Sequence, residues 1–294
     1  MAHLNFLGMG VALVTPFSAN KDIDFPALER VIDHVVGNGA DFLVVLGTTG
    51  ETPTLSDDEK KAVKNFIKEK TNGRIPLVIG VGGNNTAEVI RELKNEDFSG
   101  YSAILSVVPS YNKPSQEGIY QHFKAIAEAS PLPVILYNVP GRTGVNMTAD
   151  TALRLAHDVK GIIGIKEASG DIHQVQRLIR ERPDGFIVLS GDDGMTYPFM
   201  VLGAHGVISV LGNAYPKDFS RMVHLCLEGN YIEAVDLHFK YRDIIRLLFA
   251  DGNPAGVKCV MHDMGLIENT LRLPLVPVGD ATAEEILNWV NKLK

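Results

Sequence analysis

The chain has 294 residues, of which 45% are hydrophobic and 21% are charged, and its formal net charge is −7. This is the composition of an ordinary globular protein, and an acidic chain without a basic stripe is not a candidate nucleic-acid binder. No apolar run approaches the roughly 18 residues that a membrane-spanning helix needs. We therefore expect neither a nucleic-acid partner nor a membrane partner.

The first residues and the cysteines bear on the compartment. Residues Met1 to Asn5 carry no basic segment of the kind that begins a secretory signal. Cys226 and Cys259 are the two cysteines, and they form no metal-ligand pattern. Scarce cysteine is typical of a reducing compartment. We expect a cytoplasmic protein without a metal site.

Eight short apolar runs alternate along the chain with longer segments of helical period. The runs are 11–14, 42–46, 77–81, 103–108, 134–137, 162–165, 187–189 and 207–210. Continuous apolar strands of this kind are covered on both faces, and strict alternation of strand and helix is typical of a parallel sheet. Eight such units predict an α/β fold, the (β/α)8 TIM barrel.

The segments between the runs carry helix signals. In segment 25–37 apolar residues recur on one face. Ser56 and Glu59 have the spacing of a capping box and predict a helix that begins there. Asn85 precedes another amphipathic stretch.

More helical stretches follow the eighth run than a barrel needs. They are 215–228, 231–250, 255–264 and 283–293. A barrel unit requires a single helix after its last strand. We therefore expect residues 1–225 to form the barrel with the active site, and residues 226–294 to form a C-terminal helical appendage packed on it.

Lys166 is the most informative residue, because chemistry in such a barrel gathers at the C-terminal ends of the strands. It follows the buried apolar run 161–165 directly. Loss of solvation there disfavours the charged ammonium, and a neutral lysine amine attacks carbonyls to form Schiff bases. The alternative is a strand-end lysine whose ammonium simply reaches water.

Other strand ends carry polar side chains that suit the same chemistry. Thr48 and Thr49 lie between glycines and offer hydroxyls and N–H groups to a small carboxylate. Tyr137 and Tyr111 can exchange protons with help from neighbours, and Arg142 has the fork that carboxylates prefer. Each has a plainer interpretation as a turn, a packed aromatic or a surface arginine. Together with the lysine, they predict carbonyl chemistry on small carboxylates.

Three motifs together resemble the dihydrodipicolinate synthase family, whose members are also called 4-hydroxy-tetrahydrodipicolinate synthases. They are Gly-Thr-Thr-Gly-Glu at 47–51, Tyr-Asn-Val-Pro-Gly-Arg-Thr-Gly at 137–144 and Gly-Ile-Lys-Glu-Ala at 164–168, and the likeness runs from about Leu7 to the C-terminus. The resemblance implies that Lys166 forms a Schiff base with pyruvate and that no other cofactor is needed. The resulting enamine would attack L-aspartate 4-semialdehyde, a step of lysine and diaminopimelate biosynthesis.

The resemblance also assigns roles to residues. The implied catalytic residues are Lys166, Tyr137, Thr49, Tyr111 and Thr48, and the implied substrate-binding residues are Thr48, Thr49, Arg142, Ile208 and Gly191. Tyr137, Thr49 and Tyr111 would form a proton relay. In this family the equivalent of Tyr111 crosses a subunit interface into its neighbour's site. The resemblance therefore implies a homotetramer built as a dimer of dimers.

Three alternatives remain beside the synthase. A 2-keto-3-deoxy sugar acid aldolase and an N-acetylneuraminate lyase use the same lysine. N-acetylneuraminate lyases tend to have Ser-Thr in place of Thr48 and Thr49, and they lack the arginine, so Arg142 favours the synthase. A catalytically silent scaffold protein would usually have lost one of these polar residues, and all of them are present here.

The family often carries a feedback site for lysine at the dimer interface. Asn84 and Glu88 fit its pattern and are possible regulatory residues. Ser110 stands where an aromatic residue is usual, and Asp57 and Lys60 stand where feedback-sensitive members often have histidines. We therefore expect weak or absent inhibition by lysine.

The segment 253–258 also departs from the family's usual pattern. It reads Asn-Pro-Ala-Gly-Val-Lys, where Asn-Pro-Ile-Pro-Val-Lys is more common. We expect this difference to change the packing of helices rather than the chemistry.

Overall fold

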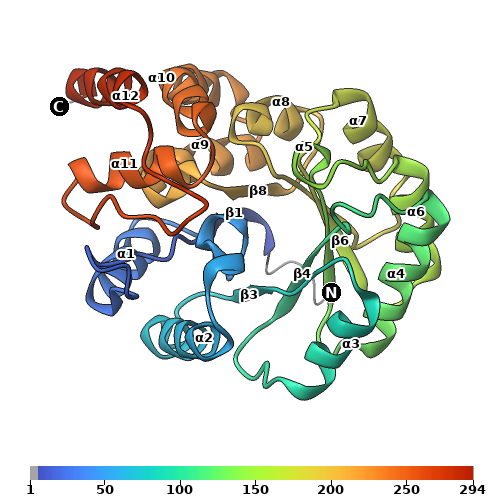
Figure 1. Ribbon diagram of the computed structural model, residues 1–294. Coiled ribbons are helices and arrows are strands. Elements are labelled where there is room, and N and C mark those ends of the chain that lie inside the picture. The colour runs from blue at the N-terminus through green and yellow to red at the C-terminus, as the bar shows by residue number, and fades with distance from the viewer. Residues whose placement is uncertain (1–5, 294) are drawn as a thin grey trace.

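The computed structural model, which describes residues 6–293, is a closed barrel of eight parallel strands surrounded by helices (Figure 1). The strands follow one another in chain order, and β8 closes the barrel by pairing with β1. The predicted TIM barrel and the predicted C-terminal helices are confirmed. The stretch Met1 to Asn5, which contributed to the cytoplasmic expectation, lies outside the described residues.

The elements agree closely with the predicted alternation. The strands are β1 (Gly8–Ala12), β2 (Phe42–Val45), β3 (Leu77–Gly80), β4 (Ala103–Val107), β5 (Val134–Asn138), β6 (Ile162–Glu167), β7 (Ile187–Ser190) and β8 (Gly206–Ser209). The helices around them are α1 (Phe25–Gly37), α2 (Asp57–Thr71), α3 (Thr86–Asn95), α4 (Gln116–Ala129), α5 (Pro140–Thr143), α6 (Ala149–Asp158), α7 (Ile172–Glu181), α8 (Thr196–Val201) and α9 (Pro216–Leu227). After them come α10 (Tyr231–Ala250), α11 (Ala255–Asp263) and α12 (Asp280–Leu293).

The first strand begins earlier than the predicted run 11–14, and that prediction was wrong. It contains Gly8 and Gly10, and glycine is depleted in strands, so the apolar pattern alone placed the strand too late. A Cβ atom on Gly10 would lie 2.2 Å from the ring of Phe42. The glycine is therefore needed for the close approach of β1 to a large side chain inside the barrel.

Helices α10, α11 and α12 gather on one side of the barrel (Figure 1). The expected boundary between residues 225 and 226 falls inside α9. Helix α9 packs against β1 and β8 as a barrel helix does. We propose that the barrel extends to the end of α9 and that the appendage begins at α10.

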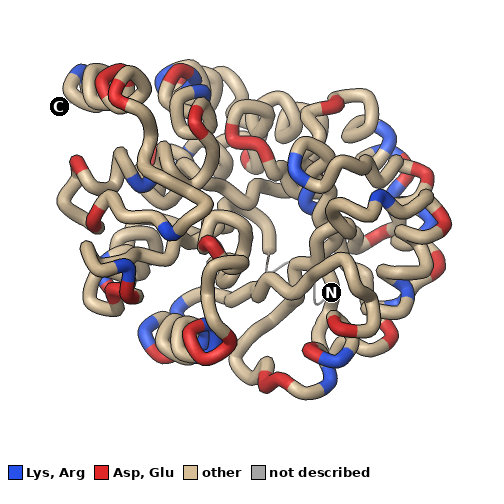
Figure 2. Tube along the Cα trace, viewed as in Figure 1, with Lys and Arg blue, Asp and Glu red and all other residues tan. Residues whose placement is uncertain are grey.

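Acidic and basic residues are interspersed along the outer helices (Figure 2). Inside the barrel, inward-facing side chains of the strands form an apolar cluster that includes Phe42, Val44 and Ile135. Across the described part of the chain, no helix has the length and apolar character needed to span a membrane.

The predicted capping box at the start of α2 is present, and it is joined to the C-terminal region. The Ser56 hydroxyl accepts a hydrogen bond from the Glu59 N–H at 3.2 Å, and the Glu59 carboxylate accepts one from the Ser56 N–H at 2.9 Å. The Arg272 guanidinium donates to both carboxylate oxygens of Glu59, at 2.6 and 2.7 Å. This bidentate pair ties α2 to the segment between α11 and α12.

The Glu59–Arg272 pair predicts a pH dependence of stability. The hydrogen bond from Arg272 lowers the pKa of Glu59 from 4.5 to about 2. A lowered carboxyl pKa adds stability that is complete above the ordinary pKa and is lost as the pH falls toward the folded-state pKa. We expect the free energy of unfolding in urea to fall more steeply between pH 5 and pH 2.5 in the wild type than in Glu59→Gln. Since glutamine also serves in a capping box, parallel pH profiles of the two proteins would contradict the assignment.

Candidate active site

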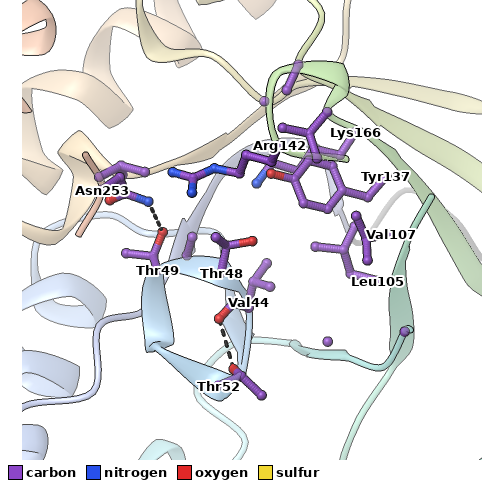
Figure 3. A pocket seen from close by; sticks show the side chains of 18 of the residues that line it. Val44, Thr48, Thr49, Thr52, Leu105, Val107, Tyr137, Arg142, Lys166 and Asn253 are labelled. Carbon is purple, nitrogen blue, oxygen red and sulfur yellow. Dashed lines mark hydrogen bonds between the residues drawn. The ribbon is translucent and has the colours of Figure 1, made fainter. Parts of the chain in front are cut away.

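A cavity of about 610 Å³ opens at the C-terminal ends of the barrel strands. Figure 3 shows the side chains that line it, which come from β2, β4, β5 and β6, from the loops that follow them, and from the chain just before α11. Six of the site residues predicted from the sequence line this cavity: Thr48, Thr49, Tyr137, Arg142, Lys166 and Gly191. Side chains more than a hundred residues apart in the sequence thus share one concave site, as a small-molecule site requires.

Lys166 and Tyr137 form the centre of the site. They are directly opposite each other in the register of β5 and β6. The Nζ atom of Lys166 lies 4.3 Å from the centre of the Tyr137 ring, and the two residues are only 6% and 7% exposed. The lysine therefore does not extend its amine into bulk water. It presents the amine to the cavity, beside a phenol that can exchange protons.

Gly191, at the end of β7, makes room for the lysine side chain. A Cβ atom on Gly191 would lie 3.0 Å from Cε of Lys166 and 2.7 Å from Cβ of Ala168. A larger residue would therefore push the lysine out of its place. The absence of a side chain at Gly191 therefore leaves the space that the Lys166 side chain occupies.

The threonine motif forms a short turn of 3-10 helix, Thr48–Gly50, directly after β2. The Thr49 hydroxyl oxygen accepts a hydrogen bond of 2.9 Å from the Nδ2 amide of Asn253 (Figure 3). Because a hydroxyl both donates and accepts, this contact leaves the Thr49 hydroxyl proton available for a different acceptor. Asn253 also lines the cavity, and no sequence motif predicted that it belongs to the site.

Arg142 lies in the short helix α5, and its guanidinium reaches toward the threonine side of the cavity (Figure 3). Within residues 6–293 it forms no ion pair and no side-chain hydrogen bond, whereas Arg154, Arg177 and Arg272 each pair with a carboxylate. An unpaired guanidinium at a cavity rim is suited to bind the carboxylate of a ligand.

Two predicted site residues do not line the cavity of the single chain. Tyr111 is 89% exposed and has a positive φ of 72°. Ile208 lies in β8, belongs to the apolar cluster inside the barrel and is 1% exposed. Neither residue contributes to the lining of this cavity.

A buried ion pair lies directly after the threonine turn. No sequence motif predicted it. Glu51 follows the turn in a left-handed conformation with φ 53°. One of its carboxylate oxygens lies 2.5 Å from Nζ of Lys258 in α11, and neither side chain has any exposed surface. Burial lowers the pKa of Lys258 to about 8, and the Glu51 carboxylate opposes that shift. The appendage is thus connected directly to the site.

The segment 253–258 lies at a close contact between two helices and also reaches the site. A Cβ atom on Gly256 would lie 2.5 Å from the backbone of Leu248, so α11 approaches α10 at this glycine. On either side of it in the sequence, Asn253 contacts Thr49 in the threonine turn, and Lys258 contacts Glu51, which follows the turn. The sequence feature that could have revealed the ion pair is Lys258 itself, because a lysine within an apolar helical stretch needs a buried partner.

Asp192 and Asp193 organise the loop after β7. Asp192 caps the following turn by accepting from the N–H groups of Gly194 and Met195. Asp193 is fully buried and accepts from two N–H groups after β8, at 2.8 and 3.0 Å. Burial raises its pKa to about 6. Across the described residues, no group of three His, Cys, Asp or Glu side chains could hold a metal ion.

The candidate regulatory residues line a second cavity, of about 570 Å³, between α2 and α3. Asn84 and Glu88 belong to its wall together with Asp57 and Lys60. The Nδ2 amide of Asn84 donates to the carbonyl of Ser110 at 3.3 Å. This cavity shares residues of the β2 and β3 strand ends with the first one.

Comparisons with known proteins agree with one another over the whole chain. Residues 5–293 match the sequence model described as the dihydrodipicolinate synthetase family. A 4-hydroxy-tetrahydrodipicolinate synthase of Phocaeicola vulgatus is 57% identical over 294 residues, which are 100% of this chain and 99% of the relative. The crystal structure of a dihydrodipicolinate synthase of Thermotoga maritima superposes with a TM-score of 0.95 at 41% identity, covering 98% of each chain. A dihydrodipicolinate synthase of Acinetobacter baumannii, described as complexed with pyruvate, has a TM-score of 0.94 at 42% identity and covers 97% of this chain and 98% of its own.

Proposed function

Because the chain belongs to the dihydrodipicolinate synthetase family, we propose that it condenses pyruvate with L-aspartate 4-semialdehyde through a Schiff base on Lys166. The observation that carries this proposal is the Lys166 amine, enclosed in the cavity and 4.3 Å from the centre of the Tyr137 ring. A buried amine beside a phenol is the equipment for imine formation with a keto acid. Apart from the covalently bound pyruvate, no cofactor takes part.

The reaction proceeds through imine formation, enamine formation, addition to the aldehyde and ring closure. The Lys166 amine adds to the keto carbon of pyruvate, and loss of water gives the iminium. Loss of a proton from the methyl group then gives the enamine, whose carbon attacks the aldehyde carbon of the semialdehyde while the aldehyde oxygen takes up a proton. Finally the amino group of the condensed product replaces the Lys166 nitrogen, which closes the ring and releases the free amine.

The polar residues around the lysine suit defined roles in these steps. Thr48 and Thr49 offer hydroxyl and N–H donors to the pyruvate carboxylate. Tyr137 moves protons at the forming imine, and Thr49 supports it because its own hydroxyl oxygen is already held by Asn253. Arg142 binds the carboxylate of the semialdehyde. Ile208 contributes its backbone, and Gly191 leaves the room that the lysine needs.

The assembly that fits this site is a homotetramer made of two dimers, working in the cytoplasm. Tyr111 is exposed on the single chain and is held by the bond from its N–H to the carbonyl of Thr143. An exposed phenol next to the rim of the site is free to enter the site of a second copy. There it would complete the relay of Tyr137 and Thr49.

Replacement of Arg142 by alanine tests the choice of acceptor. Loss of one charged hydrogen-bonding partner costs about 1.5–3 kcal/mol. We expect kcat/KM for L-aspartate 4-semialdehyde to fall about 10- to 100-fold, which is that free energy expressed as a rate. The rate of Schiff-base formation with pyruvate is expected to remain unchanged.

The control for this variant is Arg177→Ala, which removes an exposed arginine of α7 that pairs with Asp150 and Glu181. It is expected to turn over both substrates at the wild-type rate. Turnover of sugar aldehydes in preference to the semialdehyde, with no effect of Arg142→Ala, would instead support a sugar acid aldolase.

We also propose that the second cavity responds weakly to lysine. Asp57 and Lys60 lie in its wall at positions where feedback-sensitive members often have histidines, and Ser110 takes the place of the usual aromatic residue. Titration of the wild-type activity with L-lysine is expected to show no half-inhibition below the millimolar range. Half-inhibition well below millimolar, abolished by Glu88→Gln, would show a working feedback site.

A further inference from the structure

A second layer of polar residues lies behind the catalytic pair. Successive side chains of a strand point to opposite faces, so Asn138 and Glu167, which follow Tyr137 and Lys166, face the helices outside the barrel. Both are completely buried. The Nδ2 amide of Asn138 donates to the two carboxylate oxygens of Glu167, at 3.1 and 3.0 Å.

The Glu167 carboxylate is fully supplied with donors. Its Oε1 atom accepts from the N–H of Ser169 at 2.7 Å, and its Oε2 atom accepts from the Nε2 amide of Gln174 at 2.9 Å. Burial raises the pKa of Glu167, while the hydrogen bonds from Ser169, Asn138 and Gln174 oppose this shift. Donors on both oxygens fit an ionised carboxylate, which only accepts hydrogen bonds.

Asn138 is fixed on its other side by the chain that follows α5. Its Oδ1 atom accepts from the N–H of Met147 at 2.9 Å, and its Nδ2 atom also donates to Oδ1 of Asn146 at 2.7 Å. The side chain of Gln174 bonds the same segment through the carbonyl of Met147 at 3.1 Å. Asn138, Asn146, Glu167 and Gln174 therefore form one closed network with defined donors and acceptors.

A buried carboxylate at this position calls for an explanation. The layer between barrel strands and outer helices is normally apolar, and burial of an ionised group costs several kcal/mol unless it is well compensated. Neither Asn138 nor Glu167 lines the cavity. Neither side chain can therefore be a catalytic residue that touches substrate.

The pairing of β5 and β6 shows what the network can do. The register shifts between Val134 and Ile135, because Ile163 is an extra residue in β6. Beyond the shift, Tyr137 lies opposite Lys166 and Asn138 lies opposite Glu167. A slip by one residue would turn the lysine to the other face of the strand. Something must fix the register at the functional ends of these strands.

We propose that Asn138 and Glu167 are positioning residues whose hydrogen-bonded pair fixes the register of β5 and β6 and so aims the Lys166 amine at the Tyr137 phenol. This inference rests on the proposed Schiff-base function of Lys166. Irregular pairing next to an active site commonly re-aims a side chain. Here the hydrogen-bonded network on the outer face of the strands keeps Tyr137 and Lys166 opposite each other.

The test compares Glu167→Gln, Asn138→Asp and the double variant. In Glu167→Gln one of the two oxygens that accept from Asn138 becomes an NH2 group, so a donor faces a donor there. In Asn138→Asp two carboxylates face each other. In the double variant the amide at position 167 donates to the carboxylate at position 138. The hydrogen bond between the two positions is thus recovered with donor and acceptor exchanged.

The readout is the rate constant for modification of Lys166 by pyruvate and borohydride, measured by peptide mass at saturating pyruvate. Misplacement of a reacting group by about 1 Å costs on the order of 100-fold. We expect each single variant to be about 10- to 100-fold slower, and we expect the double variant to return to within about threefold of the wild type, since contacting residues are not additive. A merely structural role would lower the fraction of protein that reacts but not the rate constant of the folded fraction.

Tyr241→Phe is the matched control, because it removes a hydrogen bond of 2.8 Å from a buried tyrosine to Asp218, away from the site. It is expected to react at the wild-type rate. Wild-type rate constants for folded Glu167→Gln, or a double variant no faster than the singles, would overturn the positioning role. Absence of an adduct on wild-type Lys166 would refute the proposed function, and the positioning role with it.

Discussion

Lys166→Met is expected to lose the synthase activity by at least about 10³-fold, since removal of a covalent nucleophile leaves only binding and orientation to act. Methionine keeps an unbranched, flexible side chain in the apolar surroundings of the lysine stem. The fold should therefore persist while the amine is absent. Steady-state turnover of pyruvate with L-aspartate 4-semialdehyde measures this loss.

The control for this variant lies at the opposite end of the same strand. Lys160 is exposed just before β6, and Lys160→Met is expected to leave turnover unchanged. Circular dichroism and urea unfolding show whether both variants are folded. Substantial activity in folded Lys166→Met would mean that the chemistry does not pass through a Schiff base on this residue.

Lys258→Met is expected to destabilise the protein by about 3–5 kcal/mol, because it leaves the Glu51 carboxylate buried without its partner. Glu51 and Lys258 have no exposed side-chain surface, and Lys258 also donates to the carbonyl of Thr270 at 3.0 Å. Urea unfolding at neutral pH measures the difference. Since Glu51 directly follows the threonine turn, the affinity for pyruvate should weaken as well.

Two further variants separate the buried pair from an ordinary surface pair. Lys60→Met removes the partner of Asp57, whose side chain is 98% exposed, and such pairs contribute at most about 1 kcal/mol. The double variant Glu51→Gln with Lys258→Met removes both charges and should recover part of the lost stability. A loss below about 1 kcal/mol in Lys258→Met would contradict the role assigned to this pair.

The periodic features of the chain could be predicted from local physical chemistry. The apolar runs of β2 to β8 and the amphipathic pattern of α1 follow from burial alone, and the capping box at Ser56 is a local hydrogen-bond motif. The run predicted for β1 was misplaced because Gly8 and Gly10 carry no apolar side chain to signal a strand. Gly10 is required by the Phe42 ring on β2, and Gly8 by the side chain of Asp41 just before β2.

The barrel explains why the strand-end residues converge. Thr49, Tyr137 and Lys166 each follow or end a parallel strand, and the closed sheet brings all such ends to one face. The contacts of Asn253 with Thr49 and of Lys258 with Glu51 join residues 204 and 207 positions apart. No local pattern encodes such contacts, because they depend on where the appendage packs.

The measurement that tests the central claim most directly is the intact mass of the wild-type protein after incubation with pyruvate and borohydride, followed by peptide mapping. The account predicts one added reduced pyruvate per chain, located on Lys166. Folded protein without an adduct, or with the adduct on another lysine, would contradict the Schiff-base function and favour a catalytically silent protein or a different site.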